Sequence, residues 1–345
     1  FGGPPCQGIS LMGKRDVGDP RNELLDEFAR IVEEVEPRYF VMENVAGLVV
    51  GKHKALLDDV VHRLEGVGYV VQPPMVLQAA EYGVPQSRKR LFLIGSRNDV
   101  NVPQYPERRF TARRIDGAPV SGDLPMCPSV WDALRDLPDI DEYEELREGD
   151  SVFVEYGEAS EYGAKLRDSR TDGECFAPPR LVDGALLTSS ARTNHTKKSV
   201  ERFRNTPPGE TERVSRFLRL HPDGISNTLR AGTGSERGAY TAPRPIHPKY
   251  HRVISVREAA RLHGYPDWFR FHVTKWNGFR EVGNSVPIPL GRAVAASIMK
   301  ADNLTPVRGE PISLGEERLL SFCQREAEEY FGIKERVIPQ RERRV

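Results

Sequence analysis

One cysteine of this chain stands in surroundings that suit a covalent nucleophile. Cys6 lies in Phe1-Gly-Gly-Pro-Pro-Cys-Gln7, where glycine and proline predict a turn at the end of a strand. A thiol in such a turn is exposed and fixed in position, and its thiolate can attack an electrophilic carbon. A single cysteine is also a common small hydrophobic residue of protein interiors, so this motif alone leaves both interpretations open.

A carboxylate follows the next predicted strand. Glu43 lies in Val41-Met-Glu-Asn-Val45, where apolar neighbours predict partial burial. Burial raises the pKa of a carboxyl group, which would let Glu43 hold or deliver a proton near neutral pH. An acid near the N-terminus of a helix would have similar sequence surroundings, and this alternative stays open.

Two arginines follow in Gln86-Ser-Arg-Lys-Arg90. Side chains of an extended segment alternate with a period of two, so Arg88 and Arg90 are predicted on one side. Two guanidinium groups beside a carboxylate and a thiol would form a site for an anionic or carbonyl-rich ligand. The alternative is a charged cluster that keeps an edge strand soluble.

The elements that must position these residues alternate between helices and strands. Amphipathic spacing predicts a helix over residues 22–36, which Pro37 ends. The other predicted elements are a strand over 39–42, a helix over 53–65, a strand over 69–77 interrupted by two prolines, and a strand over 90–95. This succession predicts an α/β fold, in which ligands bind at the carboxyl ends of the strands. The turn before Cys6 and the Glu43-Asn44 pair would face the same crevice.

The second half of the chain has a different character. Residues 98–250 are rich in proline, glycine and charge, and they predict a separate irregular domain. Helical order returns at Ser255-Val-Arg-Glu258, which has the pattern of a capping box. A helix over 288–299 is expected to pack on the sheet, Gly283-Asn-Ser-Val-Pro287 before it is a predicted turn, and residues 301–345 form a charged tail with a surface helix over 316–331.

Composition limits the classes of protein to which this chain can belong. The chain has 345 residues, no apolar run near the roughly 20 that span a bilayer, and four scattered cysteines without metal-ligand spacing. This pattern predicts a reducing cytoplasm and no metal. Residues 132–174 carry 15 acidic and 5 basic residues, a net of −10, whereas residues 190–257 carry 14 basic and 5 acidic residues, a net of +9. The basic block indicates a surface for a phosphate backbone or simply a solvated face.

Five motifs together resemble the DNA (cytosine-5) methyltransferase family, in the family's order. The resemblance covers about residues 1–300. The matched segments are Phe1-Gly-Gly-Pro-Pro-Cys-Gln7, Glu43-Asn-Val45, Gln86-Ser-Arg-Lys-Arg90, Arg257-Glu-Ala-Ala-Arg-Leu262 with Gly264-Tyr-Pro-Asp267, and Gly283-Asn-Ser-Val-Pro287.

The resemblance implies the C-terminal part of a Rossmann-like, S-adenosylmethionine-dependent methyltransferase sheet and a smaller irregular target-recognition domain. Residues 1–97 would belong to the catalytic domain, 98–250 to the recognition domain, and 251–300 would return to the catalytic domain. In the family's mechanism the target cytosine is flipped out of the duplex. The resemblance implies that Cys6 is the nucleophile, that Glu43 binds the exocyclic amine and ring nitrogen 3, and that Arg90 with Arg88 holds the base carbonyl.

The resemblance also implies ligand contacts. The residues matched to the cofactor site of S-adenosylmethionine are Pro5, Leu24, Asn284, Ser285 and Val286. Double-stranded DNA is the implied partner, and residues 7–21 match the loop that closes over the flipped base. The residues expected to contact DNA are Gln7, Ser10, Arg21, Thr228, Leu229, Arg230 and Arg237.

One family motif, Phe-x-Gly-x-Gly, is expected before the nucleophile and is not in this sequence. We therefore expect a fragment, half of a split enzyme complemented by an N-terminal segment or subunit, or an inactive homologue, and weak or no activity of the chain alone. A bacterial restriction–modification role in the cytoplasm fits the compact build. A tRNA cytosine-5 methyltransferase is disfavoured because its Cys-Phe-Thr signature is absent, and a non-catalytic DNA-binding subunit is disfavoured by intact Cys6, Glu43 and Arg90.

Overall fold

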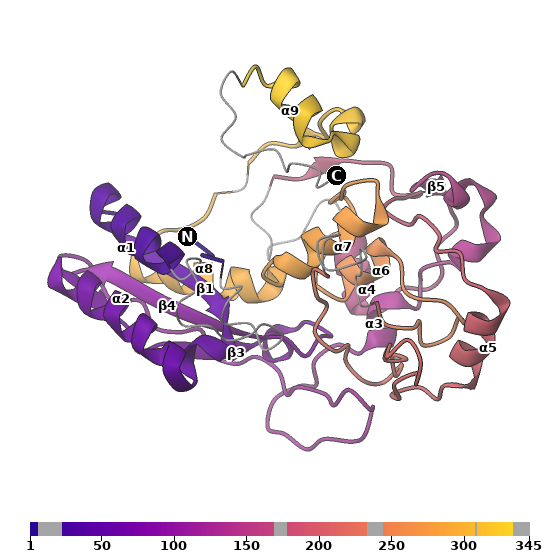
Figure 1. The fold of residues 1–345 in the computed structure, drawn as a ribbon, viewed down its shortest axis with the longest axis horizontal. Coiled ribbons are helices and arrows are strands. Elements are labelled where there is room, and N and C mark those ends of the chain that lie inside the picture. Colours follow the sequence, from indigo (N-terminus) through magenta and orange to yellow (C-terminus); the bar gives the residue numbers. More distant parts are fainter. Residues whose placement is uncertain (6–22, 169–177, 233–243, 308, 334–345) are drawn as a thin grey trace, which may run out of the picture.

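A computed structural model describes residues 1–5, 23–168, 178–232, 244–307 and 309–333. Cys6, Gln7, Ser10, Arg21 and Arg237 therefore lie outside the described residues. Figure 1 shows a sheet with helices on its faces, and beside it a second part that contains short helices joined by long connections.

The sheet is built around β4 (Lys89–Arg97). It pairs antiparallel with β1 (Tyr39–Val45), from Tyr39 opposite Ser96 to Val45 opposite Arg90. The predicted strand over 69–77 is divided at its prolines into β2 (Tyr69–Val71) and β3 (Met75–Gln78), and both pair with β4. Proline has no N–H for a ladder, so the interruption was correctly expected.

The ladder also corrects the predicted end of the first strand. The pairing of β1 with β4 continues to Val45, so Glu43 and Asn44 lie within the strand and do not follow it. Gly2 forms a parallel bridge with Met42 on the other side of β1. The start of the chain is thereby held beside the end of β1.

Helices cover both faces of this sheet. On one face lie α1 (Glu23–Val35) and α2 (Lys54–Gly66), whose apolar stripes pack on Phe40, Met42, Leu91 and Leu93. On the other face, Leu290 and Val294 of α8 (Ile288–Ala301) pack on Val41, Phe92 and Ile94. The strand residues alternate between the two clusters with the period of two that a sheet requires. The α/β fold class and these three predicted helices are confirmed.

The second part has its own core. Its helices are α3 (Val130–Leu134), α4 (Glu161–Arg167), α5 (Lys197–Asn205), α6 (Val256–Arg261) and α7 (Lys275–Asn284), and its short strands β5 (Val152–Phe153) and β7 (Leu186–Leu187) pair antiparallel. Apolar side chains of α3, α6 and α7 share one buried cluster. Elements before and after residue 250 therefore share this core. Of the helices in the segment 251–300, which was predicted to return to the catalytic domain, α6 and α7 pack in the second part and α8 packs on the sheet.

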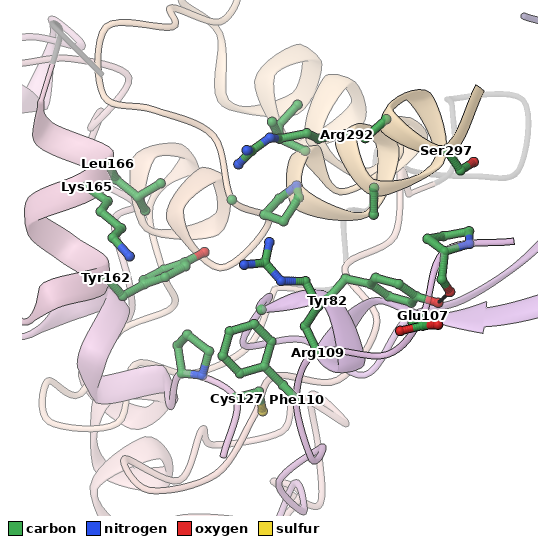
Figure 2. Close-up of a pocket in the computed structure, with 18 of the residues that line it drawn as sticks. Tyr82, Glu107, Arg109, Phe110, Cys127, Tyr162, Lys165, Leu166, Arg292 and Ser297 are labelled. Carbon is green, nitrogen blue, oxygen red and sulfur yellow. Dashed lines mark hydrogen bonds between the residues drawn. The ribbon is translucent and has the colours of Figure 1, made fainter. Parts of the chain in front are cut away.

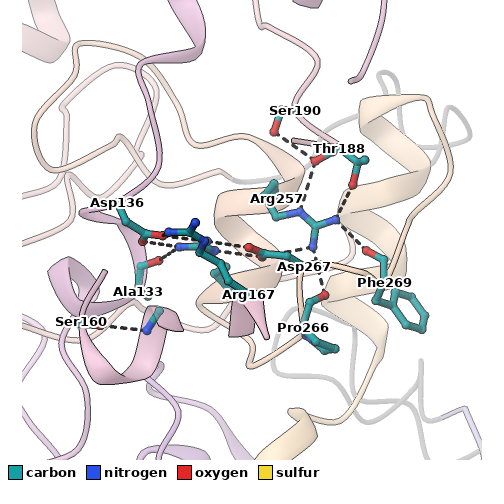
Figure 3. Close-up of polar contacts among 12 residues, drawn as sticks. Ala133, Asp136, Ser160, Arg167, Thr188, Ser190, Arg257, Pro266, Asp267 and Phe269 are labelled. Carbon is teal, nitrogen blue, oxygen red and sulfur yellow. Dashed lines mark hydrogen bonds and ion pairs between the residues drawn. The ribbon is translucent and has the colours of Figure 1, made fainter. Parts of the chain in front are cut away.

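Buried arginines tie α6 into this core. The guanidinium of Arg261 contacts Asp136 at 2.5 Å and Asp267 at 2.6 Å. Arg257 donates to the hydroxyl of Thr188 at 2.7 Å (Figure 3). The predicted capping box is present, because the Ser255 hydroxyl accepts from the Glu258 N–H while Glu258 accepts from the Ser255 N–H. The segment after residue 250 is thus fixed by charges as well as by apolar packing.

Two predictions for the C-terminal half were wrong. The surface helix expected over 316–331 is a 3₁₀ turn at Glu317–Ser321 followed by α9 (Gln324–Tyr330), because Cys323 adopts an extended backbone and caps α9. Gly283 and Asn284, expected in a turn, are the last residues of α7.

The C-terminal segment also contacts the second part of the molecule. Its strand β8 (Ile312–Ser313) pairs parallel with β6 (Arg180–Leu181). Among the described residues, no helix combines the length and apolar character needed to cross a membrane.

Candidate active site

Glu43 and Arg90 meet at one end of the sheet. Glu43 lies opposite Phe92 and Arg90 lies opposite Val45, so the two side chains are diagonal neighbours across the β1–β4 ladder. Arg90 Nε contacts Glu43 Oε1 at 2.9 Å, and their side chains are 15% and 14% exposed. The pair is therefore largely shielded from water but still reachable by a ligand.

Burial perturbs both members of the pair. It raises the pKa of Glu43 above the usual carboxyl value, although the charges of Arg90 and Arg88 act in the opposite direction. Burial likewise lowers the pKa of Arg90, with Glu43 opposing that change. A carboxyl group that takes up a proton more readily than usual, beside a guanidinium donor, can bind an amide-like edge that carries both a donor and an acceptor.

The first residues of the chain run beside this pair. The Gly2 N–H donates to Val41 O, the Glu43 N–H donates to Gly2 O, both at 2.9 Å, and the Asn44 amide donates to Pro4 O at 3.2 Å. At Gly3 a Cβ atom would lie 3.5 Å from Glu43 Oε2. The segment that leads to Cys6 is therefore held against the carboxylate.

Arg88 occupies a different environment from Arg90. It precedes β4 and is 1% exposed, and its terminal nitrogens donate to Leu229 O and Gly283 O at 2.8 Å and to Ser285 O at 2.9 Å. Burial lowers its pKa to about 9. Both terminal nitrogens thus donate to backbone carbonyls from two separate segments of the chain, Leu229 in one and Gly283 with Ser285 in the other.

Two further residues of this arrangement, Gln86 and His263, were given no role from the sequence, although Gln86 begins the Gln86-Ser-Arg-Lys-Arg90 motif. Gln86 is fully buried, accepts from the Leu229 N–H at 3.1 Å and donates to Leu262 O at 3.1 Å. Its amide nitrogen lies 2.9 Å from His263 Nδ1, while His263 Nε2 lies 3.1 Å from Ser285 O. We call Gln86, Arg88, Leu229, His263, Gly283 and Ser285 together the buried joint. Burial is predicted from the regular spacing of apolar residues, so the burial of these polar residues could not be predicted from the sequence.

The residues predicted for the cofactor lie in several places. Pro5 is exposed, and Leu24 at the start of α1 is 37% exposed. Asn284 is exposed at the end of α7, and Val286 packs against the cluster under α8. Ser285 is committed internally, because its hydroxyl donates to Val282 O and its carbonyl accepts from Arg88.

The described residues predicted to contact DNA are divided between the interior and the surface. The Thr228 hydroxyl donates to Ser87 O at 2.5 Å, and Leu229 is 4% exposed. Arg230, next in the chain, is exposed. Of these three, Arg230 presents its side chain to solvent.

A large cavity lies elsewhere. It has a volume of 1370 Å³ and is bounded by α8, α4 and the chain around residues 101–113 (Figure 2). Tyr82, Phe110 and Tyr162 form apolar walls, and Glu43 and Arg90 do not line it. Within the described ranges, no group of His, Cys, Asp or Glu side chains could hold a metal ion.

Comparison with known proteins gives consistent matches. The C-5 cytosine-specific DNA methylase family matches residues 1–300. The type II methyltransferase M.XorII of Xanthomonas oryzae pv. oryzae is 49% identical over 347 residues, which cover 100% of this chain and 78% of that protein. M.AgeI of Thalassovita gelatinovora, also a type II methyltransferase, is 30% identical over 87% of this chain and 82% of its own length.

A solved structure agrees with these relatives. It is an E. coli prophage-encoded protein described as a DNA modification methyltransferase, with a TM-score of 0.65 and 30% identity over 87% of this chain and 78% of its own. The family match covers most of the chain and includes Glu43, Arg90 and the buried joint. This chain therefore belongs to the C-5 cytosine-specific DNA methylase family, as its sequence motifs predicted.

Proposed function

We propose that this protein transfers a methyl group from S-adenosylmethionine to carbon 5 of cytosine in double-stranded DNA, as the modifying enzyme of a type II restriction–modification system. The observation that carries the proposal is the shielded Glu43–Arg90 pair at 2.9 Å, beside the segment that leads to Cys6. The similarity to M.XorII and M.AgeI, which are both type II methyltransferases, supports the restriction–modification role.

The chemistry needs a nucleophile and a binding site for one edge of the base. In the proposed reaction the Cys6 thiolate forms a bond to ring carbon 6, and the electron pair displaced from the 5,6 double bond is delocalised toward nitrogen 3. Glu43, whose pKa is raised by burial, would hold a proton at nitrogen 3 and accept from the exocyclic amine. Arg90 would donate to the base carbonyl.

The remaining bonds balance in two steps. Carbon 5 forms a bond to the methyl carbon as the sulfonium–methyl bond breaks, which leaves a neutral thioether. A base then removes the proton from carbon 5, the double bond returns, and the bond from Cys6 to carbon 6 breaks to release the thiolate. The cytosine stays in the DNA with one methyl group in place of one proton.

Some of the residues predicted to contact S-adenosylmethionine have side chains that suit this methyl donor. Asn284 presents an exposed side-chain amide, and Leu24 and Val286 offer apolar surface. Such a combination suits the polar groups and the ring of a nucleoside, whereas the Ser285 side chain is engaged within the protein. S-adenosylmethionine supplies an electrophilic methyl group when bound, and Pro5 and Asn284 remain proposed contacts.

Access to the reacting carbon requires the cytosine to leave the duplex. The proposal assigns the closing loop to residues 7–21, with Gln7, Ser10 and Arg21 at the DNA. On the recognition side, Arg230 and Arg237 would contact the duplex, and Thr228 and Leu229 would act through the backbone that carries Arg230. The exposed side chain of Arg230 supports this division.

Trapping on a modified duplex tests the proposal. Fluorine at carbon 5 cannot leave as the proton does, so a cysteine adduct should accumulate with the intact protein in the presence of S-adenosylmethionine. We expect a covalent complex with 5-fluorocytosine duplex DNA that resists denaturation and is lost on Cys6→Ser. Cys323→Ser, which changes an exposed cysteine in the C-terminal segment, is the matched control. A complex that survives Cys6→Ser would refute the assignment of the nucleophile.

A further inference from the structure

We propose that Gln86 and His263 are positioning residues, which hold the DNA-reading segment around Arg230 in a fixed place relative to Arg90 and Glu43. This inference rests on the proposed function and adds to it the means by which DNA contact and chemistry are aligned. The two side chains form one directional chain of hydrogen bonds through the buried joint.

The direction of that chain follows from its fixed ends. The Leu229 N–H can only donate, so the Gln86 atom facing it must be the oxygen. The Gln86 nitrogen then donates to Leu262 O and faces His263 Nδ1. A flipped amide would place donor against donor at Leu229 and acceptor against acceptor at Leu262, so only one orientation is satisfied.

The orientation of Gln86 decides the state of His263. Its Nδ1 faces an amide donor and must therefore carry no proton, which leaves Nε2 as the N–H that donates to Ser285 O at 3.1 Å. The charged groups near the ring are Arg88 and Arg90. Burial and these two cations lower the pKa of His263 well below its usual value, in agreement with a neutral ring.

The buried joint connects two functional segments, and in each of them the residue of the joint is close in sequence to a functional arginine. Leu229 directly precedes Arg230, and Gln86 precedes Arg90 by four residues. The segments also pair through their backbones, since the Ser87 N–H donates to Ser226 O at 2.7 Å and the Ser226 N–H donates to Pro85 O at 2.9 Å. A displacement of Gln86 must therefore move the reading segment and the start of β4 together.

A close backbone approach leaves this arrangement little freedom. A Cβ atom at Gly283 would lie 2.3 Å from Ala231 N and 2.4 Å from Arg230 C. Arg88 spans the same place by donating to both Leu229 O and Gly283 O. The end of α7 thus lies against the segment that carries Arg230. Gln86 accepts from the Leu229 N–H of that segment, and His263 connects Gln86 to Ser285 at the end of α7.

Steady-state methylation kinetics of the intact protein test this role. His263→Leu removes both ring nitrogens, whereas His263→Gln keeps one acceptor and one donor. We expect His263→Leu to lower kcat by about tenfold or more with a smaller change in KM for DNA, since small misplacements of reacting groups have large effects on rate. His263→Gln should stay within about threefold of wild type, a change below 1 kcal/mol in barrier.

A matched control separates positioning from general loss of stability. His53 is 5% exposed, and its Nδ1 has no hydrogen-bond partner among the described atoms. It precedes α2 and is not part of the buried joint, so His53→Leu should leave kcat unchanged. All variants are assayed at a temperature at which each is shown by circular dichroism to be folded.

Nitrogen NMR of histidine-labelled protein gives a readout independent of activity. We expect the His263 signals, identified by their loss in His263→Gln, to show an unprotonated Nδ1 and a protonated Nε2 at pH 7. The opposite tautomer, a ring that titrates near its ordinary pKa, or an unchanged kcat in His263→Leu would overturn the inference. If wild-type protein methylates no DNA, the proposed function fails, and the NMR result still decides the state of the joint.

Discussion

Replacement of Arg88 by methionine tests whether this residue serves the structure or the substrate. Methionine has a similar length and no donor, so the change would leave three carbonyls, those of Leu229, Gly283 and Ser285, without the guanidinium. Arg88 is 1% exposed, so water cannot replace these bonds without opening the joint. We expect the main consequence to be a loss of folding free energy.

The magnitude follows from the carbonyls that lose their donor. Ser285 O still accepts from His263 Nε2, whereas Leu229 O and Gly283 O lose the guanidinium. An unsatisfied buried polar group costs about 1–3 kcal/mol, so these two carbonyls could cost about 2–6 kcal/mol. Removal of a buried guanidinium returns several kcal/mol of desolvation free energy, which offsets part of this loss. We therefore expect the free energy of unfolding to fall by about 1–3 kcal/mol.

Urea unfolding followed by circular dichroism measures this change, and Arg90→Met is the comparison. Arg90 lies at the surface of the site and contacts Glu43, so its loss should abolish methylation with a smaller loss of stability. If Arg88→Met unfolds within about 0.5 kcal/mol of wild type yet is inactive, the bonds to the joint do not explain Arg88. It would then act on the substrate, as its sequence motif suggested.

Three further predictions concern packing and charge. Gly283→Ala places a Cβ atom 2.3 Å from Ala231 N, so calorimetry should show a lower melting temperature and a loss of about 1–3 kcal/mol. Arg261→Met leaves two carboxylates without their buried partner, and urea unfolding should show a loss of about 3–5 kcal/mol. Burial would raise the pKa of Glu258, but nearby positive charge, chiefly Arg252, lowers it to about 2. This stabilisation is complete above the unfolded value of 4.5 and is lost as pH falls toward 2, so Glu258→Gln should flatten the dependence of unfolding free energy on pH across that window. Unchanged unfolding in any of these variants would contradict the contact concerned.

The sequence predicted the elements whose burial is one-sided or complete. The stripe of α1 and the alternating faces of β1 and β4 are periodic because each contacts a separate cluster of the core. By contrast, α7 was not predicted, since its buried face includes Gly278 and Gly283, which have no apolar side chain. Those glycines are required by close contacts with distant segments, and such contacts are not encoded locally.

The same reasoning explains which site residues were predictable. Glu43 and Arg90 meet because strand register places them diagonally, and both carry charge at the end of an apolar strand. Arg88 belongs to the same motif, but β4 begins only at Lys89, so alternation along the strand does not determine its direction. Gln86 and His263 depend on contacts between residues about 140 to 180 positions apart, which no local pattern reveals.

Identification of the methylated product tests the central claim most directly. The intact protein is incubated with duplex DNA and isotope-labelled S-adenosylmethionine, and the digested nucleosides are separated by mass spectrometry. We predict that the label appears as 5-methylcytosine, and that Glu43→Gln, which keeps an acceptor for Arg90 but cannot hold the proton, abolishes it. Label on an exocyclic nitrogen of cytosine or adenine, or an unchanged yield of 5-methylcytosine with Glu43→Gln, would contradict the proposed role of the Glu43–Arg90 pair.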